Sequence, residues 1–166
     1  MAQLWVNLPA KDKKTPARYQ HLAKDNITVV PLADDAGHAR IIAGRFGSAD
    51  GAAETFKELN VWEIVLNSGA GADLDVPASH NLMLVVLRGE VRINGGQSVQ
   101  ASQMATFERE SGSVKVEAVG GEAKILLLSG VPIDEPVVGY GPFVMNTEAE
   151  IAEVMNEFRS GKFGAV

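Results

Sequence analysis

The chain of 166 residues carries 21 acidic and 15 basic side chains, for a formal net charge of −6, and 46% of its residues are hydrophobic. This composition is typical of a folded globular domain, and the negative charge argues against nucleic-acid or anionic-membrane partners, because the long-range electrostatic force would be repulsive. The absence of cysteine excludes disulfides, thiol nucleophiles and sulfur-ligated metals.

The amino-terminal half of the chain predicts short β-strands separated by turns. Residues 4–8 are expected to form a strand that ends at Pro9, and further strands are expected at 27–32, 39–46 and 61–66. The segments between them are rich in glycine, aspartate and serine, which favour turns. Many short strands of this kind indicate a closed or sandwiched β structure.

The stretch 77–96 forms the centre of the predicted fold. Residues 82–87 are an uninterrupted apolar run, too short for an independent helix and typical of a buried strand. Gly89 breaks the run, and Val91 and Ile93 then alternate with polar residues, which indicates a half-exposed strand. Residues 94–96 are Asn-Gly-Gly, which suits a tight hairpin turn. The pattern resembles the central hairpin of the cupins, which are small jelly-roll barrels.

The carboxy-terminal half predicts four more strands and one helix. The strands are expected at residues 98–101, 104–107, 114–119 and 123–128. Thr147 and Glu150 form a capping box for a helix that Gly161 ends. The helix carries apolar residues at helical spacing, namely Ile151, Val154, Met155 and Phe158. The predicted fold class is therefore all-β, a cupin-type jelly-roll barrel with one C-terminal α-helix.

The metal motif of the cupins is not matched by this sequence. That motif places two histidines and a glutamate before a glycine, and aligning its glycine with Gly89 puts the glutamate position at Leu82. The histidine positions then fall on residues that are not histidine, namely Val76 and Ala78, or Asp75 and Pro77 with the longer spacing. His80 lies between these positions, and one imidazole does not hold a metal that needs three or four ligands. We therefore predict no metal ligand.

Two parts of the chain resemble the pirin family, whose members contain two cupin barrels. Residues 4–9, Leu-Trp-Val-Asn-Leu-Pro, are similar to the segment that joins the two barrels. Residues 132–147 are similar to the carboxy-terminal signature of pirins, and the helix and residues 161–164 continue the match. The resemblance implies a pirin C-terminal cupin domain without the N-terminal metal-binding domain. The expected layout is a single domain, 1–166, with a linker-like strand at 1–10, the β-barrel at 11–130, a signature loop at 131–146 and the helix at 147–160.

The resemblance implies two alternative functions. Some pirins show quercetin 2,3-dioxygenase activity at a metal in the first barrel, whereas others bind transcription factors or enzymes. Because no family ligand maps onto this chain, we assign no catalytic residue and no cofactor, and expect a binding, regulatory or scaffolding module. The alternative is part of a quercetin 2,3-dioxygenase-like oxygenase, which would use iron or another transition metal.

Each candidate binding residue also has a purely structural explanation. His80 is a candidate for contacting a ligand at the barrel mouth, but a turn histidine before a strand is the favoured interpretation. Leu82, Leu84 and Val86 are candidates for contacting a small apolar ligand inside the barrel. His21 and His38 are expected at the surface. The acidic residues of one region are expected to be solvated carboxylates, namely Glu108, Glu110 and Glu117.

The expected partners follow from the missing first barrel. A second barrel without its neighbour would expose apolar surface, so we expect a homodimer or a separate partner domain. Trp5, Phe143 and Met145 are the candidate interface residues. No nucleic acid or membrane is expected as a partner. The first residues lack a signal-peptide pattern and no apolar run approaches the ~20 residues of a membrane span, so the expected location is cytoplasmic.

Overall fold

The computed structural model describes residues 2–109 and 113–163, and its contacts divide the chain into two compact units. The larger unit is the continuous stretch Tyr19–Pro132. The smaller unit joins the segments that precede Tyr19 and follow Pro132. Among the helices in the described residues, none combines the length and the hydropathy that crossing a bilayer requires.

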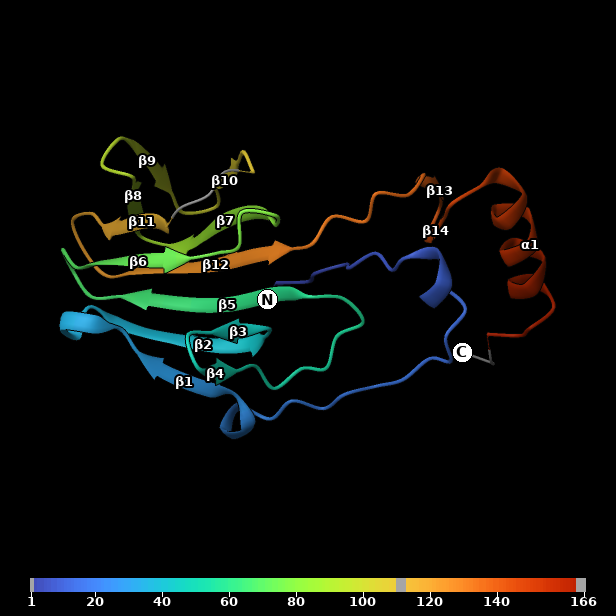
Figure 1. Cartoon of the computed structure of the whole chain (residues 1–166), viewed down its shortest axis with the longest axis horizontal. Helices are drawn as coiled ribbons and strands as arrows, with labels where there is room; N and C mark the ends of the chain where they lie inside the picture. The colour runs from blue at the N-terminus through green and yellow to red at the C-terminus, as the bar shows by residue number, and fades with distance from the viewer. Residues whose placement is uncertain (1, 110–112, 164–166) are drawn as a thin grey trace. The chain divides into compact units, whose positions relative to one another are not determined.

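The larger unit is built from two antiparallel β-sheets (Figure 1). The six-stranded sheet has the order β1 (Thr28–Pro31), β2 (Gly37–Ala43), β5 (Leu59–Leu66), β12 (Ala123–Gly130), β7 (Asn81–Arg88) and β10 (Met104–Phe107). The four-stranded sheet has the order β6 (Gly71–Asp75), β11 (Ser113–Ala118), β8 (Glu90–Ile93) and β9 (Gln97–Gln100). A small hairpin, β3 (Arg45–Phe46) and β4 (Ala49–Asp50), follows β2. Two short 3-10 helices, Lys24–Asn26 and Ala33–Asp35, also belong to the larger unit, and a third, Ala10–Asp12, belongs to the smaller one.

The two sheets share one hydrophobic core. Successive side chains of a strand point to opposite faces, so every second residue is buried. On β7, Leu82, Leu84 and Val86 are buried, whereas Met83 and Val85 are only partly covered. Along β5 the buried residues include Trp62, whose indole makes an edge-to-face contact with Phe46, with ring centroids 5.0 Å apart. The core is therefore enclosed between the inner faces of both sheets.

The predicted turns of the central stretch are confirmed. Gly89 has φ 76° and separates β7 from β8. Asn94 and Gly95 have φ 49° and 69° and connect β8 to β9. These positive φ values are the reason that glycine and asparagine occupy the turns, since other residues adopt this region at a steric cost.

The smaller unit contains a hairpin and a helix. Strands β13 (Val138–Tyr140) and β14 (Phe143–Met145) pair in antiparallel fashion and are followed by α1 (Glu148–Arg159). The predicted capping box is confirmed, because the Thr147 side chain accepts a hydrogen bond from the Glu150 backbone N–H. The unit has its own small core, formed by Met145, Ile151 and Val154.

Three local predictions differ from the structure. Residues 4–8 were expected as a strand but have no strand conformation, because an alternating pattern forms a strand only where a neighbouring edge offers backbone partners. The expected signature loop contains the β13–β14 hairpin, whose turn includes Gly141 at φ 56°. Strand β6 was missed because Leu74 is its only fully buried residue, which leaves a weak hydrophobic pattern.

Candidate functional site

A cluster of buried polar side chains lies at one end of the larger unit, which we call the barrel mouth. Asn60 lies near the start of β5, Ser129 near the end of β12, and His80 in the turn before β7. Asn60 and Ser129 are opposite each other in the β5–β12 ladder. All three side chains are buried. Buried polar groups destabilise a fold unless they are hydrogen-bonded, so their partners define the chemistry of this site.

The three side chains form a chain of hydrogen bonds. The backbone N–H of Arg45 donates to Asn60 Oδ1 at 3.0 Å, and Asn60 Nδ2 donates to Ser129 Oγ at 2.9 Å. Ser129 Oγ lies 3.3 Å from His80 Nδ1. Since Ser129 already accepts from Asn60, its own hydrogen is available for Nδ1, which favours the imidazole tautomer protonated on Nε2. His80 Nε2 in turn faces Glu58 Oε1 at 3.6 Å.

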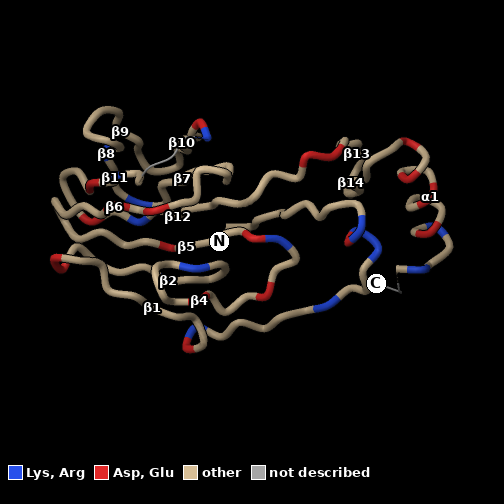
Figure 2. Tube along the Cα trace, viewed as in Figure 1, with Lys and Arg blue, Asp and Glu red and all other residues tan. Residues whose placement is uncertain are grey.

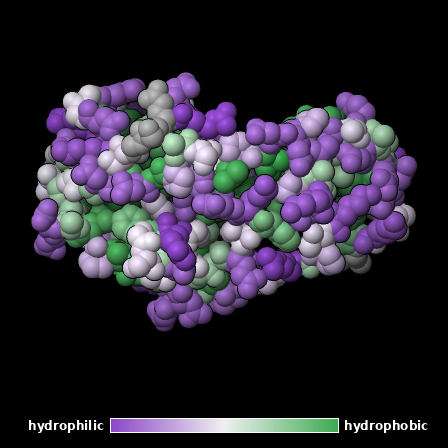
Figure 3. Space-filling model, in the orientation of Figure 1, coloured by the Kyte–Doolittle hydropathy of each residue, from purple (hydrophilic) through white to green (hydrophobic). Residues whose placement is uncertain are grey.

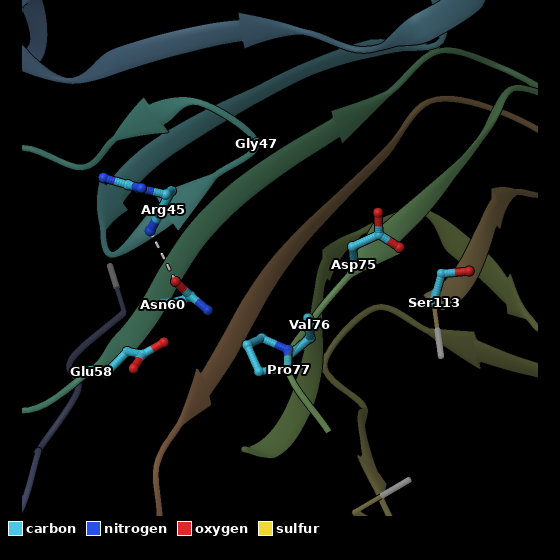
Figure 4. Close-up of a pocket in the computed structure, with 8 residues that line it drawn as sticks. All are labelled: Arg45, Gly47, Glu58, Asn60, Asp75, Val76, Pro77 and Ser113. Atoms are coloured by element: carbon cyan, nitrogen blue, oxygen red, sulfur yellow. Dashed lines mark hydrogen bonds between the residues drawn. The ribbon is translucent and has the colours of Figure 1, made fainter. Parts of the chain in front are cut away.

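A pocket of about 510 Å³ opens above this cluster (Figure 4). It is lined by Arg45, Gly47, Glu58, Asn60, Asp75, Val76, Pro77 and Ser113. Figure 4 shows Glu58 and Asp75 on opposite sides of Val76 and Pro77. The guanidinium of Arg45 is bound to Asp50, with Nε 2.8 Å from the carboxylate. The pocket therefore combines acidic groups with a small apolar wall.

The histidines and carboxylates that the structure describes do not assemble into a metal site. Within residues 2–109 and 113–163, no group of three histidine, aspartate or glutamate side chains is placed to hold a metal ion. His80 is at the mouth, whereas His21 is exposed on a loop and His38 lies half-buried on β2. Of the three acidic candidates, Glu108 is exposed, Glu117 lies half-buried on β11, and Glu110 is outside the described residues.

The apolar candidates lie deeper than the pocket. Leu82, Leu84 and Val86 face inward, as a ligand site would need, and they pack against the other core residues. None of them lines the pocket at the mouth. Contact of these residues with a small apolar ligand remains a prediction.

The three interface candidates all belong to the smaller unit. Trp5 is 71% exposed. Phe143 packs against Phe158, with ring centroids 5.8 Å apart, and Met145 is buried in the core of that unit. Trp5 is therefore the candidate whose side chain is free to meet a partner.

The outer faces of the two sheets differ in character. The outer face of the six-stranded sheet carries partly exposed apolar residues on its central strands, namely Val61, Val65, Met83, Val85, Leu126 and Leu128. The outer face of the four-stranded sheet carries polar residues, namely Asp73, Glu90, Arg92, Ser98, Lys115 and Glu117. Figure 3 shows hydrophobic surface on the larger unit, over the strands labelled β5 and β2 in Figure 1. Each of these six apolar side chains is partly covered, and large contiguous apolar patches on protein surfaces are a known mark of interaction sites.

A charged row crosses the apolar outer face. Glu63 on β5 is paired with Arg40 on β2 at 3.0 Å and with Lys124 on β12 at 2.8 Å. Burial would raise the pKa of Glu63, but hydrogen bonds and charges from Lys124 and Arg40 outweigh burial and hold that pKa below its usual value. Figure 2 shows how few charged residues interrupt the tan trace of β5 and β12. These ion pairs tie three neighbouring strands together.

Sequence reasoning missed Asn60, Ser129, Glu58 and Arg45. The sequence pattern contained a signal for the first two. Asn60 is two residues before the buried Trp62 and so faces the same side of β5, and Ser129 continues the series of buried positions along β12. A polar residue at an inward-facing position near the end of a strand predicts a buried hydrogen-bonding site. No such signal exists for Glu58 and Arg45, which the folded chain brings to the mouth from loop and hairpin.

Residues 61–164 match the family described as the Pirin C-terminal cupin domain. The chain belongs to the pirin family. The fold prediction of a cupin barrel and the resemblance to the pirin C-terminal domain are thereby confirmed.

The pirin match extends to relatives and solved structures. A Pseudomonas aeruginosa protein named "Putative quercetin 2,3-dioxygenase" is 44% identical over 98% of this chain and 56% of its own length. A pirin-like protein of Caulobacter vibrioides is 35% identical over 97% of this chain and 58% of its own length. The crystal structure of quercetin 2,3-dioxygenase from Acinetobacter baumannii has a TM-score of 0.92 and 43% identity, covering 97% of this chain and 56% of that one. The chain thus spans little more than half the length of these relatives.

Proposed function

We propose that this pirin barrel is a binding and scaffolding module that needs no metal, and that it pairs with a second barrel through the outer face of the six-stranded sheet. For the chain by itself, the second barrel is another copy, which gives a homodimer. The observation that carries the proposal is the contrast between the two outer faces, one apolar and one polar.

The apolar face has the properties of a protein interface. Met83 and Val85 on β7 and Leu126 and Leu128 on β12 lie on neighbouring central strands, so their side chains form one continuous patch. Burying such a patch removes apolar surface from water at about 25 cal/mol per Å². The relatives named above extend well beyond the region that this chain matches, which supports a second structural unit as the occupant.

The barrel mouth supports a role other than metal catalysis. The histidine there uses Nδ1 for the hydrogen bond with Ser129, and the inward positions beyond it are filled by Leu82 and Leu84. A metal held in this barrel would need at least three donor side chains around one point. Such a set is not found within the described residues.

Sedimentation equilibrium or light scattering of the purified chain tests the pairing. We expect a mass near twice 17.6 kDa at about 100 µM. Val85→Lys places a charge in the centre of the apolar face and is expected to give a monomer with unchanged circular dichroism. Gln100→Lys, on the outer face of the polar sheet, is the matched control and is expected to leave the dimer intact. A wild-type chain that stays monomeric at high micromolar concentration would contradict the proposed pairing.

A quercetin 2,3-dioxygenase-like oxygenase is the second candidate function. It is favoured by the name of the Pseudomonas aeruginosa relative, which matches almost the whole of this chain. The two functions differ in their metal requirement. Metal analysis of the purified chain, followed by a flavonol-turnover assay with added iron, nickel or zinc, separates them. A stoichiometric metal together with flavonol consumption would replace the scaffold proposal by the oxygenase.

A further inference from the structure

The six-stranded sheet ends at an open edge on β10. Strand β7 is the neighbour of β10 on one side, and no strand of the described residues pairs with the other side. Val86 donates its backbone N–H to the Gln103 carbonyl at 3.0 Å and accepts the Ser102 N–H at 2.8 Å, so both main-chain groups of Val86 point toward β10. Because the bonds of an antiparallel pair alternate along it, this contact fixes the direction of the main-chain groups that follow.

Two residues of β10 present their main-chain groups to the open edge. The residues two and four positions before Val86 continue the alternation, so their partners Ala105 and Phe107 bond to β7. Met104 and Thr106 occupy the alternate positions, and their N–H and C=O groups therefore point away from β7. No hydrogen-bond partner for these groups lies within residues 2–109 and 113–163.

Two of the other sheet edges are protected against the addition of a strand. Strand β1, at the far edge of the same sheet, carries Pro31, and the Thr28 hydroxyl donates at 3.0 Å to a carbonyl of β4. Strand β6, at one edge of the four-stranded sheet, carries Asp73 and Asp75. Prolines, charges and covering segments are the usual means by which proteins keep a sheet edge from pairing with another chain.

The segment that carries β9 and β10 lacks these protective features. Residues 95–107 contain no charged residue and no proline, although 22% of the chain is charged. A pocket of about 560 Å³ lies along this segment, and it is lined by residues 97–99 of β9 and by residues 103–106. The open edge of β10 therefore has free space beside it, where an added strand would lie about 4.8 Å away.

We infer that β10 binds an extended peptide segment of a partner protein, which adds to the six-stranded sheet as a further strand. An extended backbone is the ligand that matches N–H and C=O groups presented by every second residue of an edge strand. The inference goes beyond the proposed pairing of two barrels, because it depends on the main chain of one edge strand.

The side chains around the edge define the chemistry of the segment. The glutamine, serine and threonine side chains at the pocket offer hydrogen bonds but no counter-charge, so a charged residue placed there would lose hydration without gaining an ion pair. Met104 is 56% exposed and lies opposite Val85, so the apolar outer face reaches this edge. A segment with uncharged polar and apolar residues in alternation places an apolar side chain beside Met104.

Amide hydrogen exchange measured by NMR tests the edge in the full chain. The probe is a capped hexapeptide that alternates threonine and valine, and the control peptide has the same sequence with every amide nitrogen methylated. We expect the N–H groups of Met104 and Thr106 to exchange fast in the free chain and at least about tenfold more slowly with saturating probe. Ala105 and Phe107 should be protected in both states. Slow exchange at Met104 and Thr106 in the free chain, no slowing with the probe, or equal slowing with the methylated peptide would overturn the inference.

Variants locate the binding at β10. Thr106→Pro removes an N–H that makes no bond to β7, so we expect unchanged circular dichroism and about tenfold weaker binding in fluorescence anisotropy of the labelled probe. Thr106→Lys adds a charge of the kind that protects other edges, keeps the backbone N–H, and is expected to weaken binding to a similar extent. Val29→Lys is the matched control, since Val29 is 55% exposed on β1 at the opposite edge of the same sheet. Unchanged binding in both Thr106 variants, or equal loss in Val29→Lys, would refute the assigned edge.

Discussion

Replacing Asn60 by leucine tests whether the polar cluster holds the barrel mouth together. Leucine has the same branched shape and the same number of side-chain heavy atoms as asparagine, but it cannot form hydrogen bonds. Asn60 is 6% exposed and makes two of them, one at 3.0 Å from the Arg45 backbone N–H and one at 2.9 Å to Ser129. Leucine would leave the Arg45 N–H without a partner and remove one of the two contacts of Ser129.

The expected loss in the free energy of unfolding is about 2–4 kcal/mol, since an unsatisfied buried group costs about 1–3 kcal/mol and a lost neutral hydrogen bond about 1 kcal/mol. Urea unfolding followed by tryptophan fluorescence measures it, because Trp62 lies two residues along the same strand. Asn67→Leu is the control, since Asn67 is exposed and makes one hydrogen bond to the Asp35 carbonyl. A cost below about 1 kcal/mol for Asn60→Leu, or one no larger than in the control, would refute the reasoning.

Three further predictions concern the barrel. Glu63→Gln should lower the free energy of unfolding by about 1–2 kcal/mol at pH 7. Because the folded pKa of Glu63 is below its unfolded value, the difference between the two proteins is present above about pH 4.3 and disappears as the pH falls through the folded pKa. Urea unfolding at several pH values checks this. Gly44→Ala should cost more than about 3 kcal/mol, or prevent folding, because Gly44 has φ 80° and its β-carbon would collide with Asn60 Oδ1; a normal melting temperature would contradict this. Leu84→Ala should cost about 2–5 kcal/mol, whereas Met104→Ala, at 56% exposure, should cost less than about 1 kcal/mol in the same assay.

The sequence predicted the parts of the fold that depend on local chemistry. Gly89 and the Asn94–Gly95 turn mark positive φ values that other residues adopt reluctantly, so these boundaries were correct. The capping pair Thr147 and Glu150 located the helix start correctly for the same kind of local reason. The segment 4–8 was wrong as a strand, because strand formation requires a pairing edge that no local pattern specifies.

The candidate site was only partly predictable. His80 was a candidate, which the structure places as a buried side chain in the turn before β7, but its partners come from residues distant along the chain, with Ser129 49 residues away. A side-chain hydrogen bond across this separation depends on strand order, and β12 pairing with both β5 and β7 is what brings Asn60, Ser129 and the turn of His80 together. The pocket above them depends on the same pairing, and on β3 and β6 ending at the same mouth.

The sequence alone indicated a β structure with one terminal helix, because turns, caps and apolar runs are local properties of the polypeptide, and its resemblance to pirins implied the type of barrel. It left open which residues of the run 82–87 face inward, since that run is apolar on both faces. Tertiary structure decided this by placing β7 between β12 and β10, with Leu82, Leu84 and Val86 toward the second sheet and Met83 and Val85 on the outer face. Only the pairing of distant strands fixes which side of a doubly apolar strand is the core and which is a surface for a partner.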